Sequence, residues 1–191
     1  MQALVEAGLP VSAVISNRAD AGGLDYARAK GIATAVVEHG AGGGRPGFEA
    51  ALEREIAQFK PRLIALAGFM RVLSGAFVER YRQRMLNIHP SLLPAFPGLD
   101  THARALAAGV KLHGCTVHFV TPELDTGPIV IQAALPVRAQ EPPDQLAARV
   151  LRQEHVIYPR AARWFLEDRL VIQDGVVRVK GNDAQLVMAA D

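Results

Sequence analysis

The sequence has little cysteine and no long apolar run. Cys115 is its single cysteine among 191 residues, so an intrachain disulfide is excluded and a reducing compartment suits the chain. No apolar stretch approaches the ~20 residues that a membrane-spanning helix needs. The N-terminus lacks the basic flank and apolar segment of a signal peptide. We therefore expect a cytoplasmic protein with no membrane partner.

Charge of one sign and compact metal-ligand motifs are also scarce. The net charge is +2 and no long basic run occurs, so binding to nucleic acid is not predicted. His89, His118 and Asp125 are possible metal ligands, but none of them belongs to a compact pattern such as His-x-x-x-His, and we predict no metal site.

Apolar residues make up 50% of the sequence, enough for a sizeable core. At this length we expect one domain over residues 1–191, with residues 168–191 forming a terminal hairpin and tail. Apolar strands at residues 11–16, 34–37 and 63–68 alternate with helical patterns, which predicts a parallel α/β sheet.

The second half of the chain indicates antiparallel strands at residues 113–120 and 129–137, followed by a long helix that begins near Pro142 and Pro143. The glycine-rich residues 41–47 are expected to form a loop. The predicted fold is an open, Rossmann-like α/β sheet, mostly parallel with antiparallel C-terminal strands and helices on both faces.

Two polar residues stand at the end of an apolar segment that Pro90 interrupts. Asn87 and His89 are two residues apart, so on a strand they share one face. They would place an amide donor beside an imidazole at the carboxyl end of a buried strand, where open α/β sheets bind ligands. Asp125 follows in a loop between apolar strands, and beside His89 it could hold the imidazole in one tautomer and support a charge on it.

The sequence offers no clear protein nucleophile. Cys115 alternates with Val117 and Phe119 on an expected core face, which favours an inert buried thiol. No serine lies in a Gly-x-Ser-x-Gly motif. An acid/base group and an oxyanion donor without a nucleophile indicate group transfer in which the substrate itself attacks.

Four blocks of sequence carry a family resemblance: residues 67–73, residues 87–102, residues 113–127 and residues 153–159. With them the chain resembles the phosphoribosylglycinamide formyltransferases, folate-dependent enzymes of purine synthesis, over nearly its whole length. The resemblance implies a formyltransferase-type sheet, no metal, and a monomer or homodimer. It implies two small-molecule partners, glycinamide ribonucleotide and the co-substrate 10-formyltetrahydrofolate.

The resemblance also implies a role for each site residue. Asn87 and protonated His89 would stabilise the oxyanion formed when the glycinamide amine attacks the formyl carbon, and Asp125 would support the charge on His89 and help to move the proton. Thr116 and His118 would contact these catalytic residues and would not contact the substrates themselves. The implied folate contacts are Arg45, Met70, Arg71, Val72, Leu73, Asn87, Thr121, Pro122, Glu123, Leu124 and Asp125, and the implied ribonucleotide contacts are His89, Leu151, Arg152, Gln153 and Glu154.

One feature departs from the family pattern. The family begins with a strand and a Gly-Ser-Asn loop that binds the substrate phosphate, whereas residues 1–4 here match the helix after that loop. We therefore expect an N-terminally incomplete domain whose natural chain starts upstream. Two alternative functions stay open, a formyltetrahydrofolate hydrolase, in which water replaces the amine, and an inactive, truncated folate-binding protein.

Overall fold

The computed structural model describes residues 1–38 and 43–189. Contacts within the chain group it into two compact units, Met1–Arg62 and Leu63–Asp191. The single domain expected from the sequence stays a prediction.

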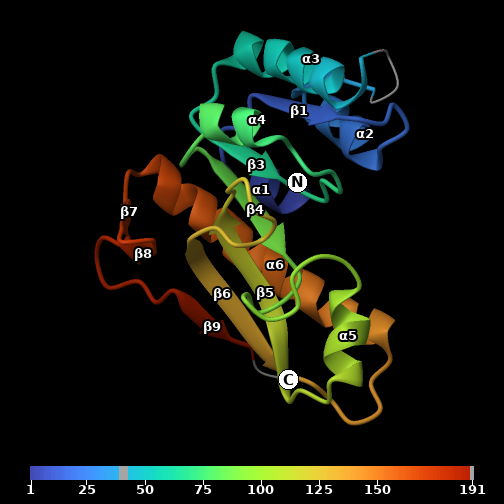
Figure 1. Ribbon diagram of the computed structural model, residues 1–191, viewed down its shortest axis with the longest axis vertical. Coiled ribbons are helices and arrows are strands. Elements are labelled where there is room, and N and C mark those ends of the chain that lie inside the picture. Colours follow the sequence, from blue (N-terminus) through green and yellow to red (C-terminus); the bar gives the residue numbers. More distant parts are fainter. Residues whose placement is uncertain (39–42, 190–191) are drawn as a thin grey trace. The chain divides into compact units, whose positions relative to one another are not determined.

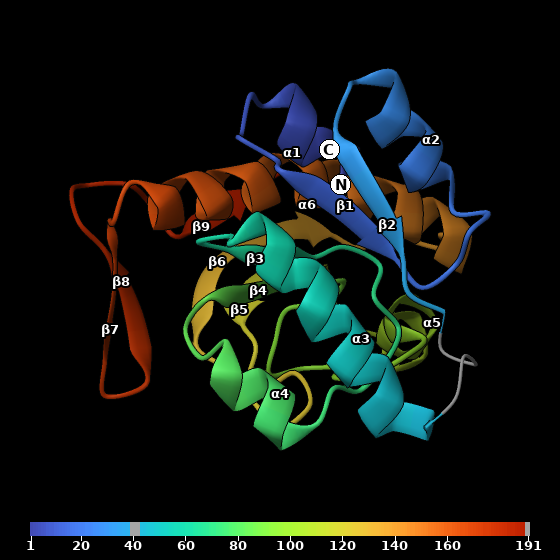
Figure 2. The same ribbon diagram turned by 90° about the horizontal axis from the view of Figure 1, so that it is seen from above.

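The first unit contains a small parallel sheet. Strands β1 (Ala13–Ser16) and β2 (Ala33–Val36) pair in parallel, from Ala13 opposite Ala33 to Ser16 opposite Val36. Helix α2 (Gly22–Ala29) connects them and packs on this pair (Figure 2). A short helix, α1 (Gln2–Glu6), precedes β1.

Helix α3 (Gly44–Phe59) begins earlier than the sequence indicated. The loop expected at residues 41–47 is therefore wrong from Gly44 onward, while its first two residues lie outside the described part of the chain. Pro46 is tolerated because the backbone N–H groups of the first helical turn need no partner within the helix. Gly43, with a φ of +80°, supplies the left-handed turn that leads into the helix.

The second unit is built on a sheet of five strands in the order β3-β4-β5-β6-β9 (Figure 1). Strands β3 (Ile64–Leu66) and β4 (Met85–His89) are parallel, and β5 (Leu112–Phe119) and β6 (Ile129–Pro136) continue the sheet antiparallel. The α/β class and the change to antiparallel pairing after β4 are confirmed.

Strand β9 (Leu186–Met188) is a feature that the sequence analysis missed. It pairs in parallel with β6, with Gln132 opposite Leu186 and Ala134 opposite Met188. Three residues are too few for a periodic signal, and an edge strand exposes half of its side chains. The segment expected to be only a tail therefore adds a strand to the sheet.

A long helix, α6 (Pro143–Leu166), packs on one face of this sheet. The ring of Phe165 lies 6.3 Å, centroid to centroid, from that of Phe119 on β5. The buried hydroxyl of Tyr158 shares its one proton between the carbonyl oxygens of Leu66 (2.7 Å) on β3 and Leu86 (3.0 Å) on β4. The helix thus holds together the two strands that lead to Asn87.

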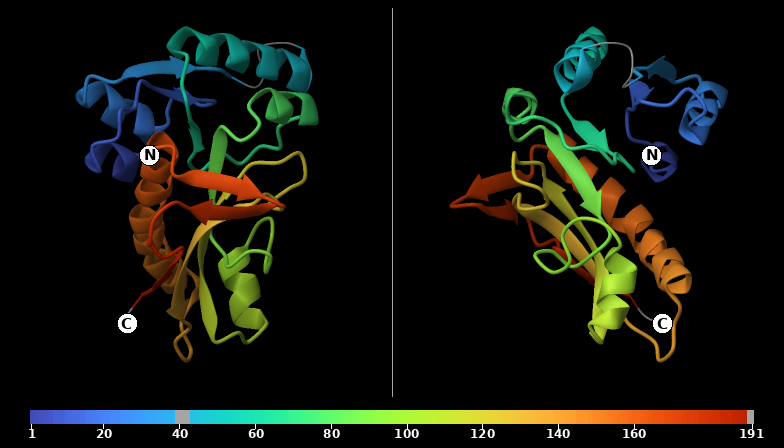
Figure 3. Two further views of the ribbon diagram at one scale, coloured as in Figure 1. Left: turned by 90° about the vertical axis from the view of Figure 1, so that its left-hand side faces the viewer. Right: turned by 45° about the vertical axis from the view of Figure 1, so that its right-hand side comes forward.

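Shorter elements complete the second unit. Helix α4 (Gly75–Arg80) is capped by Ser74, whose Oγ accepts from the backbone N–H of Phe77 at 3.2 Å. Helix α5 (Thr101–Ala107) precedes β5. Strands β7 (Leu170–Gln173) and β8 (Val176–Val179) form an antiparallel hairpin that projects beyond the sheet (Figure 3). No helix among the described residues is both long enough and apolar enough to cross a bilayer.

Candidate active site

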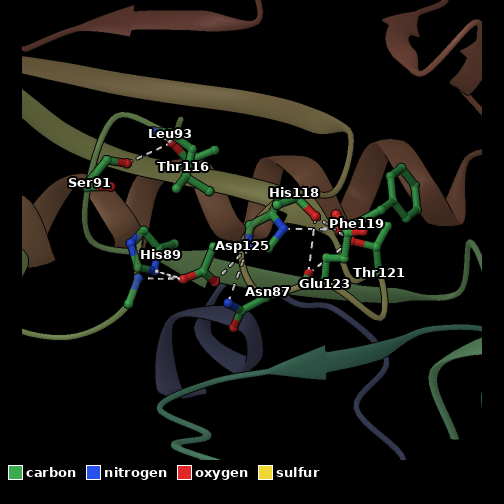
Figure 4. Close-up of polar contacts among 12 residues, drawn as sticks. Asn87, His89, Ser91, Leu93, Thr116, His118, Phe119, Thr121, Glu123 and Asp125 are labelled. Carbon is green, nitrogen blue, oxygen red and sulfur yellow. Dashed lines mark hydrogen bonds and ion pairs between the residues drawn. The ribbon is translucent and has the colours of Figure 1, made fainter. Parts of the chain in front are cut away.

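Strand pairing brings four polar side chains to one face of the sheet. Asn87 on β4 lies opposite His118 on β5, and His89 lies opposite Thr116. All four point away from α6, because residues one apart on a strand face opposite sides. His89, Thr116 and His118 are buried. Figure 4 shows Asn87, His89 and His118 directed toward Asp125.

Asp125 approaches this face from the loop between β5 and β6. One carboxylate oxygen, Oδ2, lies 3.4 Å from Nδ1 of His89, and the other, Oδ1, lies 3.8 Å from Nε2 of His118. The backbone N–H of Gly98 donates to Oδ2 at 2.9 Å. The side chains of His89 and Asp125 are each 7% exposed, so little water weakens the attraction between them.

An oxygen atom faces each ring nitrogen of His89. Nε2 lies 3.0 Å from the carbonyl oxygen of Phe96, which can only accept, and Nδ1 faces the Asp125 carboxylate. The two oxygens set the orientation of the ring.

The surroundings of His118 favour its neutral form. Burial has the largest effect on the pKa of His118 and lowers it, the Phe119 carbonyl and Asp125 raise it by less, and His89 has the smallest effect, which lowers it. As a neutral ring it donates from Nδ1 to the carbonyl oxygen of Phe119 at 3.0 Å, so Nε2 is free to accept from Nδ2 of Asn87 at 3.3 Å. His118 thereby orients the Asn87 amide.

A loop rich in proline, residues 90–100, covers this face and is called the proline loop below. It supplies the Phe96 carbonyl and the Gly98 N–H described above. Its start is held by Thr116, whose Oγ1 donates to the carbonyl oxygen of Ser91 at 2.7 Å and accepts from the N–H of Leu93 at 3.1 Å.

Gln132 on β6 belongs to the same group, and the sequence analysis missed it. Its Nε2 donates to Oγ1 of Thr116 and to the carbonyl oxygen of Leu93, both at 2.9 Å. The available signal was a lone amide within the apolar strand that runs from Ile129 to Leu135.

Two further histidines, the half-buried His102 and the buried His113, lie near the proline loop. Nδ1 of His102 is 3.1 Å from Nε2 of His113, and the Phe96 ring meets His113 edge-on. Burial lowers the pKa of both, to about 4 for His113, and the charge on His89 lowers them further. Both rings are therefore neutral near pH 7.

The expected folate contacts divide into buried and exposed side chains. Leu73 is buried, whereas Met70 is 80%, Val72 55% and Leu124 59% exposed. Gly75, at the start of α4, lies close to the side chain of Pro122 in the Asp125 loop. Arg71, Pro122 and Glu123 are also exposed, while Thr121 is half-buried and its hydroxyl lies near the Glu123 carbonyl oxygen (Figure 4).

The expected ribonucleotide contacts on α6 are not brought into this cluster. The charge of Glu154 acts on the thiol of Cys115, which is on the α6 side of β5. Gln153 and Glu154 are half-buried, and burial raises the pKa of the Glu154 carboxyl, while Leu151 and Arg152 are exposed. Their roles stay predictions.

Arg45 is an exposed side chain, and Cys115 is a buried one. Arg45 is exposed in the first turn of α3, within the first unit, and its role also stays a prediction. Burial raises the pKa of the Cys115 thiol, which suits an inert side chain. Among the described residues no group of three or more His, Cys, Asp and Glu side chains is arranged to hold a metal ion.

An amide donor, an imidazole and a carboxylate without a nucleophile define a group-transfer site, and comparison with known proteins agrees. The family model described as "Formyl transferase" matches residues 2–162. The chain belongs to the formyl transferase family.

Particular relatives narrow this class to the phosphoribosylglycinamide formyltransferases. The chain is 49% identical to that enzyme from Escherichia coli K12 over 90% of this chain and 81% of the relative. It is also 47% identical to part of the chicken "Trifunctional purine biosynthetic protein adenosine-3". That match covers 78% of this chain and 15% of the chicken protein. The structure of the Coxiella burnetii phosphoribosylglycinamide formyltransferase superposes with a TM-score of 0.89 at 46% identity, over 94% of this chain and 87% of that one.

The rival function is represented among the solved structures, at lower identity. A formyltetrahydrofolate deformylase from Pseudomonas syringae gives a TM-score of 0.86 at 28% identity. The match covers 93% of this chain and 61% of the deformylase. The comparisons therefore support the transferase over the deformylase.

Proposed function

We propose that this protein transfers the formyl group of 10-formyltetrahydrofolate to the amine of glycinamide ribonucleotide, a step of purine synthesis. The observation that carries the proposal is the meeting of Asn87, His89 and Asp125 at the carboxyl end of β4. Family membership supports it, because the relatives named above carry this activity in their names.

The reaction needs stabilisation of one negative charge. Attack of an amine nitrogen on a formyl carbon forms a C–N bond and turns the formyl oxygen into an oxyanion. Asn87 has a second Nδ2–H besides the one that His118 accepts. We propose that this N–H and the charged His89 ring face the oxyanion, where one such donor is typically worth about 3–4 kcal/mol.

The reaction also moves one proton. The attacking nitrogen loses a proton and the leaving folate nitrogen gains one as its C–N bond to the formyl carbon breaks. Asp125 is the ionisable group beside His89 and is held by the Gly98 N–H. We propose that it balances the charge on His89 and assists this transfer.

Exposed apolar side chains beside the site suit an aromatic co-substrate. Met70, Val72 and Leu124 are large apolar side chains that the protein exposes, and an exposed apolar side chain can serve as a contact for an aromatic ligand. We propose that residues 70–73 and 121–125 bind the folate, with Arg45 toward its glutamate end. We propose His89 and residues 151–154 for the ribonucleotide, with Glu154 suited to the ribose hydroxyls.

A single assay separates this function from its alternatives. The protein is given 10-formyltetrahydrofolate with and without glycinamide ribonucleotide, and formylated product and free formate are both measured. Formylated product that disappears in Asn87→Leu supports the transferase. Formate release that does not depend on the ribonucleotide indicates the hydrolase, and folate binding without either product indicates an inactive folate-binding protein.

We also propose a cytoplasmic location and a monomer or homodimer. Light scattering during gel filtration, at several protein concentrations, measures the oligomeric state. A mass above that of two chains would contradict this part of the proposal.

A further inference from the structure

We infer that Gln132 is a positioning residue of the active site, acting through the proline loop. The inference rests on the proposed function for its kinetic consequence. Gln132 contacts none of the groups proposed to meet the substrate, but it fixes the backbone that holds two of them.

The chain of contacts starts from strand register. His89, Thr116 and Gln132 lie opposite one another on β4, β5 and β6, so their side chains share the face that carries the site. On this face Gln132 donates both of its Nε2–H groups, one to Oγ1 of Thr116 and one to the Leu93 carbonyl oxygen. Thr116 in turn holds Leu93 and Ser91.

These contacts leave no free partner within the group. The Thr116 hydroxyl has one proton, donated to Ser91, and its oxygen accepts from Leu93 and from Gln132. If Gln132 is lost, the Leu93 carbonyl loses its side-chain donor in a half-buried place. A group left in this way costs more than the bond itself was worth, so the loop is expected to shift.

A shift of the proline loop reaches the reacting groups through two backbone atoms. The Phe96 carbonyl accepts from His89, and the Gly98 N–H donates to Asp125. Both lie within five residues of Leu93 in the loop. Moving them changes the distance between the charges on His89 and Asp125 without removing either residue.

The chain contains a matched control in Gln185. Its Nε2 also donates to two oxygens, the carbonyls of Val130 (2.7 Å) and Val177 (3.1 Å), and it is also half-buried. Gln132→Met and Gln185→Met therefore remove the same number of hydrogen bonds from the same kind of side chain. Only the first touches the proline loop.

The test compares the two variants in kinetics and in amide hydrogen exchange. We expect Gln132→Met to lower kcat about tenfold, with both KM values within about twofold of the wild type, because misplaced reacting groups slow the chemical step. The Leu93 and Gly98 amides should exchange faster. Gln185→Met should leave kcat and both amides unchanged.

Other outcomes overturn the inference. Equal losses of kcat in both variants would show general destabilisation, and wild-type kcat and exchange in Gln132→Met would show that Gln132 does not position the loop. If Gln132→Met fails to fold, Gln132→Glu and Gln185→Glu take the place of the two variants, because each keeps the side-chain length and removes the two donated N–H groups. In that pair kcat should fall only in Gln132→Glu.

The exchange measurement uses no substrate, so it separates this inference from the proposed function. If the wild type forms no formylated product, the proposed function fails. Faster exchange at Gly98 in Gln132→Met, but not in Gln185→Met, would still support the positioning role.

Discussion

Both faces of strand β5 are buried, but one face carries apolar side chains and the other carries polar side chains. From Cys115 to Phe119 all side chains are nearly inaccessible. Cys115, Val117 and Phe119 turn toward α6 and pack as a core, whereas Thr116 and His118 turn toward the proline loop and Asp125 with a partner for each polar atom. Burial alone therefore does not distinguish core from site, because a satisfied polar group can be buried at little cost.

The strongest test of this comparison removes the charge that the polar face meets. Asp125→Asn keeps an oxygen for the Gly98 N–H, and asparagine tolerates the φ of +55° at this position. We expect kcat for formyl transfer to fall on the order of 10³-fold because the charge beside His89 is lost. Steady-state kinetics measures this, with thermal unfolding as the control for folding. A loss of less than tenfold would contradict the role of Asp125.

The apolar face should respond in stability instead of activity. Val117→Ala removes two buried carbons next to α6 and should lower the free energy of unfolding by about 2 kcal/mol. Urea denaturation measures the change, and kcat should stay within about twofold of the wild type. A large loss of kcat with unchanged stability would mean that this face belongs to the site.

His113 tests the cost of a buried, titratable side chain. Its pKa falls to about 4, through burial first and then through His102 and His89, against a smaller opposing effect of the Pro90 carbonyl. In the unfolded chain a histidine has a pKa of about 6.5. As the pH falls from 6.5 toward 4, the unfolded chain binds the proton first, so the free energy of unfolding decreases.

The expected decrease from this one residue is about 2 kcal/mol between pH 6.5 and pH 4.5. Urea denaturation at both pH values should show it in the wild type, and His113→Leu should lose correspondingly less. Equal pH dependence in the two proteins would assign the effect to other groups.

The smallest expected effect concerns the orientation of Asn87. His118→Phe keeps a ring but removes the acceptor for the Asn87 amide, so kcat should fall about tenfold. His118→Gln places an oxygen near the former Nε2 and should recover most of the activity. If the two variants are equally impaired, His118 acts through packing and not through this hydrogen bond.

Much of the fold could be predicted from local pattern. The end of β4 follows from alternation, and the long helix α6 follows from its proline start. The early start of α3 and the short strand β9 could not, because a glycine-rich helix start and a three-residue edge strand carry no periodic signal.

The sequence by itself determined which residue types are present and which of them share a face of a strand. Asn87 and His89 share a face because they are two apart on a strand, and the absence of a nucleophile follows from the side chains present. Asp125 was a candidate from its place in a loop between apolar strands, and it lies 3.4 Å from His89.

Only the tertiary structure decided which groups surround these residues. The contacts made by the Phe96 carbonyl, the Gly98 N–H and Gln132 come from segments whose sequence does not predict a place in the site. Asn87 meets His118 across a separation of 31 residues. The physical reason is that strand register and loop path depend on how the whole sheet buries its apolar face, and a local pattern of residues does not contain that information.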